Sequence, residues 1–176
     1  MVITIRPVSF LDIEDIARLA DDMDIARMTA CMPSPYTRKD AQNWVEGLST
    51  RPNKHAFAIC GDGLMGVVGL ICDPEHDRAE LGYWLGRPFW GKGATTAAVR
   101  LAVDYAFLEL KVRRVYAYCF AGNIASRRVL EKNGLFYEGC LKQHTVRMGT
   151  VHDLLCFGLL KEDYLGKDTK THNEDL

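Results

Sequence analysis

The sequence predicts a single domain of mixed α/β class. Its 176 residues suit one domain, and its 48% hydrophobic content is ordinary for a globular protein. Helical and strand patterns are interspersed along the chain, and we find no internal repeat and no linker. Short turns between the early strands indicate antiparallel pairs, whereas a helix joins strands 78–86 and 112–120 and predicts that these two are parallel neighbours.

The first third of the chain predicts one strand and two principal helices. Residues 2–8 alternate in polarity and indicate a strand, and residues 9–22 indicate a helix with Ser9 as its N-cap. Residues 23–36 are rich in methionine and proline and predict a short helix with a loop, before a helix over 37–48. The apolar residues expected on one face of the first helix are Leu11, Ile13, Ile16 and Leu19.

The rest of the domain alternates strands and helices up to residue 165. The last residues, 166–176, are polar, and we expect them to form a disordered tail. The expected elements are a hairpin over 55–73 that turns at 61–63, a strand over 78–86, a helix over 95–110, a strand over 112–120, a helix over 123–134 and two strands that meet at 148–149.

Charge and cysteine usage exclude several classes of protein. A net charge of −1 argues against broad attraction to nucleic acid or to an anionic membrane. No apolar run approaches about 18 residues, and the N-terminus lacks the layout of a signal peptide. The six cysteines form no CxxC pair and the five histidines show no ligand spacing, so we expect reduced thiols, a cytoplasmic protein and no metal.

The stretch GRPFWGKGATT, residues 86–96, follows a predicted strand and opens a predicted helix. Backbone N–H groups at a helix N-terminus attract anions, and Gly91 and Gly93 permit close approach of the backbone to oxygen atoms. Thr95 or Thr96 can add a hydroxyl donor. The stretch therefore predicts a site for a phosphate or a diphosphate.

A nucleoside triphosphate is the first alternative occupant, because Gly86, Gly91 and Lys92 match the P-loop pattern. The next position of that pattern is Gly93, which has no hydroxyl to hold magnesium. The following strand ends on Phe120, where a P-loop enzyme would carry an aspartate. A second alternative is that the glycines serve only a tight turn.

The segments AELGYWLGRPFWGKGATTAAVRLAVDYAF and NIASRRVLEKNGLFYEG resemble the GNAT acetyltransferases, specifically their RimJ/RimL-like branch. The resemblance implies a GNAT fold, in which a mixed, mostly antiparallel sheet of about seven strands splays between its fourth and fifth strands and about four helices flank it. It implies acetyl-CoA as the cofactor. The loop around its pyrophosphate would comprise Gly91, Lys92, Gly93, Ala94, Thr95 and Thr96.

The loop departs from the family pattern, Gln/Arg-x-x-Gly-x-Gly/Ala, at two positions. Trp90 occupies the Gln/Arg position, in the WGKG form common in this branch, and Thr95 occupies the last position. Both departures leave the first glycine of the pattern, Gly93, in place.

The resemblance also places the pantetheine arm of the coenzyme. It implies that the arm pairs with the strand carrying Tyr83, Trp84 and Leu85, and that the N–H of Leu85 points at the acetyl carbonyl. An open strand edge can satisfy the amides of pantetheine, and a fixed N–H stabilises a developing oxyanion. Asn123 would hydrogen-bond the same arm; the alternative is that Asn123 is a plain N-cap.

For the chemistry, the resemblance implies Glu80 as the general base and Ser126 as the group that protonates the departing thiolate. The alternatives are that Glu80 is a surface carboxylate paired with Arg78, and that Ser126 is simply a first-turn serine. Many GNAT enzymes carry a tyrosine acid at the position of Leu130, which this chain lacks. Cys119 is better explained as a core residue than as an acetyl-accepting nucleophile.

The expected acceptor is a primary amine, most simply the α-amino group of a protein, because EGCLKQ, residues 138–143, resembles the RimL-type proteins that acetylate ribosomal proteins. A small amine, such as a polyamine or an amine antibiotic, and a non-catalytic acyl-CoA sensor are the alternatives. Dimers are common in the branch, and a homodimer stays open because the sequence shows no interface. In the segment 21–37, Asp21, Asp22 and Asp24 are of a type that suits a cationic acceptor, unless they end a helix.

Overall fold

The computed structural model describes residues 2–171 and, for side chains, residues 2–166. Its strands and helices follow the expected order, with two additional short helices and one additional C-terminal helix. The elements are β1 (Thr4–Pro7), η1 (Phe10–Asp12), α1 (Ile13–Ala20), α2 (Met23–Met28), α3 (Arg38–Ser49), β2 (Lys54–Gly61), β3 (Gly63–Asp73), β4 (Arg78–Leu85), η2 (Arg87–Phe89), α4 (Ala94–Leu108), β5 (Arg114–Phe120), α5 (Ile124–Lys132), β6 (Phe136–Arg147), β7 (Thr150–Leu160) and α6 (Lys161–Thr171).

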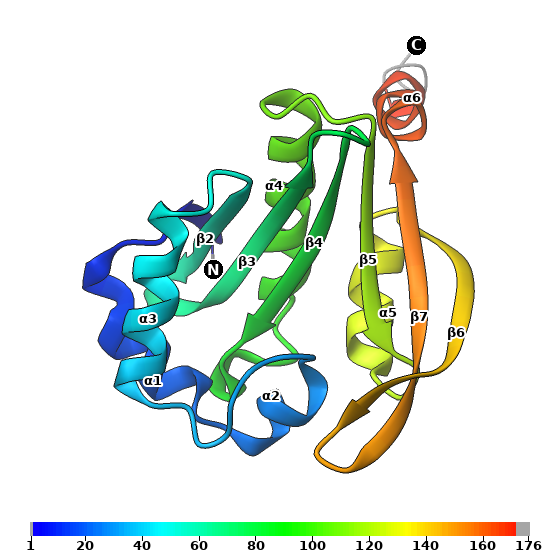
Figure 1. The fold of residues 1–176 in the computed structure, drawn as a ribbon. Helices are drawn as coiled ribbons and strands as arrows, with labels where there is room; N and C mark the ends of the chain where they lie inside the picture. The colour runs from blue at the N-terminus through cyan, green and yellow to red at the C-terminus, as the bar shows by residue number, and fades with distance from the viewer. Residues whose placement is uncertain (1, 172–176) are drawn as a thin grey trace.

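One seven-stranded sheet in the order β1-β2-β3-β4-β5-β7-β6 forms the centre of the fold. Every neighbouring pair is antiparallel except β4 and β5, which are parallel. Helices α4 and α5 cover one face of the sheet, and α1 and α3 cover part of the other (Figure 1). The expected mixed, mostly antiparallel sheet is therefore confirmed.

Helix α4 packs against the sheet through a stripe of alanines four residues apart. Ala94, Ala98, Ala102 and Ala106 are all buried, and Val99, Val103 and Phe107 fill the space beside them. Because alanine adds only one methyl group, the helix backbone can lie close to the strands at interior packing density. The beginning of α4 is thereby fixed relative to the end of β4.

The first helix is shorter than the sequence predicts. Residues 10–12 form the 3-10 helix η1, α1 begins only at Ile13, and Leu11 is 93% exposed instead of lying on the apolar face. The reason is Asp12, which is 4% exposed and accepts hydrogen bonds from Arg6 at 2.6 and 2.8 Å and from Ser9 N at 2.8 Å. Turning Asp12 inward rotates Leu11 toward solvent.

Part of the expected C-terminal tail is helical. Helix α6 continues to Thr171, so residues 166–171 of the expected tail are helical, and residues 172–176 lie outside the described part of the chain.

Replacing Asp12 tests the link between β1 and the first helix. Arg6 lowers the pKa of Asp12, so this pair stabilises the fold above the ordinary aspartate pKa and loses its effect as the pH falls through the lowered value. We expect Asp12→Asn to reduce the free energy of unfolding by about 2 kcal/mol at pH 7, with the difference from wild type narrowing in acid.

Urea unfolding at several pH values measures this difference. Asp15→Asn is the control, because Asp15 pairs with Arg18 on the exposed surface and we expect a change below about 0.5 kcal/mol. A difference from wild type that stays constant down to pH 3 would contradict the assigned role of the Asp12 carboxylate.

Candidate functional site

The parallel strands β4 and β5 separate after three residue pairs. In the strand register, Arg78 lies beside Arg114, Ala79 beside Val115 and Glu80 beside Tyr116, and the ladder ends there. Beyond that point β4 continues to Leu85 bonded only to β3, and β5 continues to Phe120 bonded only to β7. Figure 1 shows the two strands diverging toward the end of the sheet where α2 lies. The splay expected between the fourth and fifth strands is therefore present.

The separated edge of β4 carries backbone groups that no strand pairs. Gly86 N donates to Met65 O on β3 at 2.8 Å. Because successive N–H groups point to opposite edges of a strand, the N–H groups of Tyr83 and Leu85 face the β5 side, where pairing has ended. This edge can bind an extended chain that contains amides.

The loop between β4 and α4 is tied to its own strand by two side chains. The indole Nε1 of Trp90 donates to Leu85 O at 2.6 Å, and Lys92 Nζ donates to Pro88 O at 2.9 Å. Trp90 therefore braces the loop at the position where the family pattern has Gln or Arg. The Lys92 ammonium lies on the exposed side of the same loop.

Gly91 and Gly93 both have positive φ, 74° and 79°. A Cβ added at either glycine would meet no heavy atom within 4 Å, so the backbone conformation and not crowding by the protein requires glycine there. The first hydrogen bond of α4 runs from Ala97 N to Gly93 O, which leaves the amides of the first turn without helical partners. Open space above free amides fits a diphosphate.

Helix α5 begins beside the separated strands and carries the Asn-x-x-Ser motif. The Oδ1 of Asn123 accepts from Ser126 N at 3.0 Å, so Asn123 caps the helix. The cap uses the side-chain oxygen and does not consume the Nδ2–H donors. Ser126 Oγ lies 2.8 Å from the hydroxyl of Tyr83 on β4, so these two predicted site residues meet across the opening.

Cys119 lies in the main hydrophobic core, 6% exposed, close to Ser126. Burial raises the pKa of its thiol to about 11, although the hydrogen bond with Ser126 opposes this effect. A thiol that stays protonated at neutral pH is a poor nucleophile. The interpretation of Cys119 as a core residue agrees with this environment.

Glu80 lies on the opposite face of the sheet from α4, because its neighbours Ala79 and Leu81 are buried in the α4 core. Its carboxylate accepts a long hydrogen bond of 3.4 Å from Tyr116. Arg78 pairs with Asp73 at 3.0 Å, so the neighbour that contacts Glu80 is Tyr116 and not Arg78. Glu80 therefore stands where the strands part, beside a phenol whose pKa is raised by burial and by the Glu80 charge itself.

The three carboxylates considered for binding a cationic acceptor are used by the protein itself. Asp21 Oδ1 accepts from Tyr36 N at 3.0 Å, Asp22 caps α2, and Asp24 pairs with Arg87 at 2.6 Å. The bond between Asp21 and Tyr36 joins the two ends of the segment 21–36, and the Asp24–Arg87 pair attaches α2 to the residues that follow β4. The expectation that these aspartates bind the amine is not supported by their contacts.

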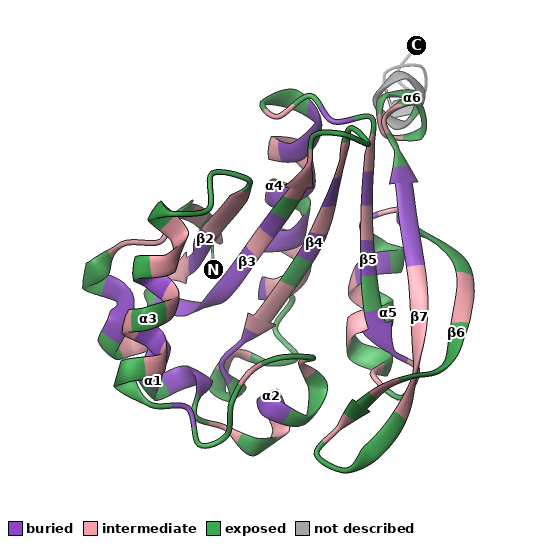
Figure 2. Ribbon diagram, viewed as in Figure 1, coloured by how far each residue is buried: buried purple, intermediate pink, exposed green. Residues whose placement is uncertain are grey.

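Sequence reasoning missed Arg147, which ties the hairpin of β6 and β7 to the α2 segment. Its Nε donates to Ala26 O at 2.8 Å, and its Nη2 donates to Met32 O. Residues around the hairpin tip are mostly exposed, whereas Ile25 and Ala26 of α2 are buried (Figure 2). Because the bonded residues are more than a hundred positions apart and the acceptors are backbone carbonyls, the sequence carries no signal for this contact.

Comparison with known proteins identifies the family. A family model described as an acetyltransferase (GNAT) domain matches residues 3–135. The chain belongs to the GNAT acetyltransferase family. It is 37% identical over 130 residues, 72% of each chain, to the probable N-acetyltransferase YjcK of Bacillus subtilis. It is 39% identical over 105 residues, 59% of this chain and 57% of the relative, to the putative ribosomal N-acetyltransferase YdaF of the same organism.

Solved structures agree with this assignment to the GNAT family. A crystal structure of a probable acetyltransferase superposes with a TM-score of 0.81 at 31% identity and covers 92% of this chain and 94% of its own. Mycobacterium smegmatis RimJ in complex with CoA-disulfide superposes with a TM-score of 0.85 at 24% identity, covering 92% and 83%. The GNAT enzymes use acetyl-CoA, and this chain is an acetyl-CoA-dependent member.

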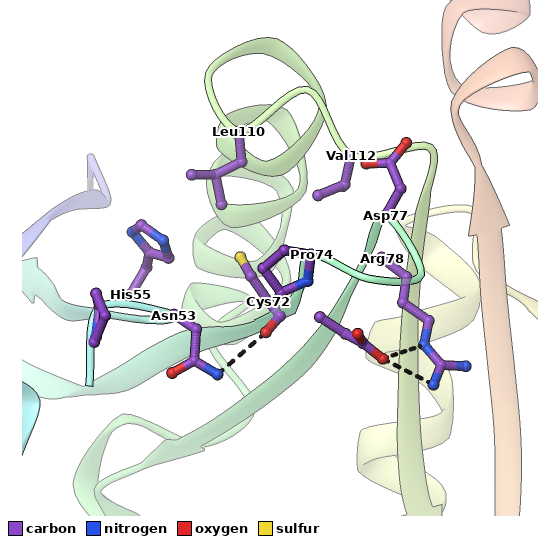
Figure 3. Close-up of a pocket in the computed structure, with 10 residues that line it drawn as sticks. Asn53, His55, Cys72, Pro74, Asp77, Arg78, Leu110 and Val112 are labelled. Carbon is purple, nitrogen blue, oxygen red and sulfur yellow. Dashed lines mark hydrogen bonds and ion pairs between the residues drawn. The ribbon is translucent and has the colours of Figure 1, made fainter.

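A pocket of about 450 Å³ lies at the far end of the GNAT sheet, away from the glycine loop. Figure 3 shows Leu110 and Val112 on one side of it and His55 and Cys72 on another. The Asp73–Arg78 ion pair forms part of its wall. Because β4 and β5 are still paired at Arg78, this pocket is separate from the opening between the strands.

The described residues were also compared with the requirements of a membrane span and of a metal site. Within residues 2–171, every helix is too short or too polar to cross a lipid bilayer. Over that same range, no three His, Cys, Asp or Glu side chains are arranged to hold a metal ion, and all six cysteines are free thiols.

Gly93→Glu tests the glycine loop as the coenzyme site. A side chain at φ 79° costs about 1–2 kcal/mol, which an exposed loop tolerates, but its carboxylate would occupy the space above the amides and repel a diphosphate. We expect the variant to fold, by circular dichroism, and to lose acetyl-CoA binding in isothermal titration calorimetry. Gly47→Glu, which adds the same charge on α3, is the control, and wild-type affinity in Gly93→Glu would refute the loop assignment.

Arg147→Ala tests the tie between the hairpin and α2. Loss of two hydrogen bonds from a charged donor should speed amide hydrogen exchange of residues 23–32 at least about tenfold, with the core of the sheet unaffected. Arg51→Ala, on the surface after α3, is the control. Unchanged exchange in Arg147→Ala would show that the segment is held by other contacts.

Proposed function

We propose that this enzyme moves the acetyl group of acetyl-CoA directly to a primary amine, and that the amine is the N-terminal α-amino group of a protein. The observation that carries the proposal is the unpaired edge of β4, which leads from Glu80 to the glycine loop at the start of α4. An extended arm with amides and a diphosphate at its end matches the two parts of this site.

The residues that would hold the coenzyme lie along one line. The loop from Gly91 to Thr96 would bind the diphosphate through its backbone N–H groups, and the edge at Tyr83, Trp84 and Leu85 would pair with the pantetheine arm. Asn123 would add Nδ2–H donors from the opposite side of the opening. When bound there, acetyl-CoA supplies an activated thioester carbonyl.

The transfer forms a bond between the amine nitrogen and the acetyl carbon and breaks the bond between that carbon and sulfur. The N–H of Leu85 or Tyr83 would stabilise negative charge on the carbonyl oxygen. Glu80 would take the proton of the amine through a water, and the electron pair of the broken bond would go to sulfur, beside Ser126. Because Cys119 stays protonated, direct transfer is favoured over an acetyl-cysteine step.

The electrostatics of the acceptor side favour an α-amino group over a polyamine. A polyamine carries several positive charges and needs several free carboxylates. Here Asp21, Asp22 and Asp24 are engaged, and Asp153 pairs with Lys142. An α-amino group carries one charge and has a reference pKa of about 7.7–8.0, so a single base such as Glu80 suffices. The similarity to YdaF supports the same class.

A ligand test comes first. At 100 times its dissociation constant, acetyl-CoA should raise the free energy of unfolding by about 2.7 kcal/mol, which is visible as an increase in Tm. We expect this shift with acetyl-CoA and none with Mg-ATP. A shift with Mg-ATP alone would overturn the coenzyme assignment and would support the P-loop alternative.

The acceptor class is tested by release of free CoA thiol with a panel of amines. The panel contains short peptides that differ in their first residue, the same peptides with an acetylated N-terminus, and spermidine. We expect turnover only with free N-termini. Turnover with spermidine and not with peptides would establish the small-amine alternative, and coenzyme binding without turnover on any amine would favour the acyl-CoA sensor.

A further inference from the structure

The side chain of Tyr83 connects the two elements that border the opening. Tyr83 lies on the separated part of β4, and its hydroxyl reaches Ser126 at the start of α5, 2.8 Å from Oγ and 3.2 Å from the backbone O. Both residues are partly buried. The contact joins residues 43 positions apart, at the level of the sheet where β4 and β5 are no longer paired.

Two arrangements of the protons are open to these groups. The backbone O of Ser126 can only accept, so Tyr83 is the donor at that contact, whereas at the shorter contact with Ser126 Oγ either hydroxyl can donate. Burial raises the pKa of Tyr83, although the hydrogen bond with Ser126 opposes this effect, so the phenol keeps its proton at neutral pH. When Tyr83 donates to Ser126 Oγ, the single hydroxyl hydrogen of Ser126 is free to turn to another acceptor, and the donation strengthens it as a donor.

We propose that Tyr83 is a positioning residue that holds the Ser126 hydroxyl so that its hydrogen points at the sulfur of bound coenzyme A. This inference rests on the proposed function. As the carbon–sulfur bond breaks, sulfur takes the electron pair and accepts the hydrogen bond from Ser126, while Tyr83 donates to Ser126 Oγ and keeps its own proton. The bound thiolate is thus stabilised by a chain of two hydrogen bonds.

Cys119, Arg127 and Leu130, which also lie near Ser126, are less suited to this role. Cys119 is close to Ser126, but a protonated thiol is a weak donor. Arg127 is engaged with Glu131 at 2.7 Å. Leu130 occupies the position at which many GNAT enzymes carry a tyrosine, and it is completely buried in the core. In this chain a phenol therefore reaches the site from β4 instead of from α5.

The test measures the pKa of the thiol of bound CoA, which needs no acceptor amine. The ultraviolet absorbance of the thiolate is titrated in the full-length protein saturated with CoA, and the titration of the protein alone is subtracted. An ordinary thiol has a pKa of about 8.5. We expect the wild type to lower the pKa of bound CoA, Ser126→Ala to raise it by about 1, and Tyr83→Phe to raise it by about 0.5.

The double variant Tyr83→Phe/Ser126→Ala shows whether Tyr83 changes the pKa of the CoA thiol through Ser126 or independently of Ser126. If Tyr83 acts through Ser126, the double variant has the same CoA thiol pKa as Ser126→Ala alone. The control is Tyr105→Phe, which removes a phenolic hydroxyl from α4, where Tyr105 packs against Phe57 at 4.9 Å, and should leave the pKa unchanged.

Two results would overturn the inference while leaving the proposed function intact: a wild-type thiol pKa in Tyr83→Phe with CoA bound, or additive effects of the two substitutions. Failure of CoA to bind the wild-type protein would instead refute the coenzyme site itself, and the inference with it. Thermal unfolding of each variant shows whether a change reflects loss of the fold.

Discussion

The end of pairing between β4 and β5 is the constraint on which the rest of the site depends. Two parallel strands that part after Glu80 and Tyr116 leave the facing edges of β4 and β5 without strand partners beyond that point. Backbone groups on such edges are stable only in contact with water or with a ligand that hydrogen-bonds to them. The alanine stripe of α4 and the left-handed glycines then place a helix N-terminus at the end of that open edge.

The two faces of the opening carry different chemistry. Tyr83 and Ser126 lie on the side of α4 and α5, whereas Glu80 and Tyr116 lie on the other face, because side chains alternate along a strand. In the proposed reaction, Ser126 can therefore contact the leaving sulfur from one face of the sheet, while Glu80 contacts the incoming amine from the other. This division suits direct transfer between two bound substrates.

Charged side chains on the acceptor face mainly hold the protein together. Arg87 and Arg147 attach the α2 segment to the two halves of the sheet. Asp24 pairs with Arg87, whereas Asp21 and Asp22 accept hydrogen bonds from backbone N–H groups of the same segment. Under the proposed function, specificity for the amine depends on the shape of this segment more than on free charge. Such a segment can restrict which amines reach Glu80 without offering them a carboxylate of its own.

Local sequence determined the order of the elements, the glycine loop before α4 and the helix capped by Asn123, because each follows from the glycines, caps and periodicity of neighbouring residues. Local sequence did not determine the partners of Asp12, Glu80 or Asp24. It also did not determine the contact of Arg147 with the α2 segment or the contact of Tyr83 with Ser126. Each of those contacts joins side chains or carbonyls from separate elements. Periodicity states which face a residue occupies, and only the packing of whole elements decides which side chain on another element comes within hydrogen-bond distance.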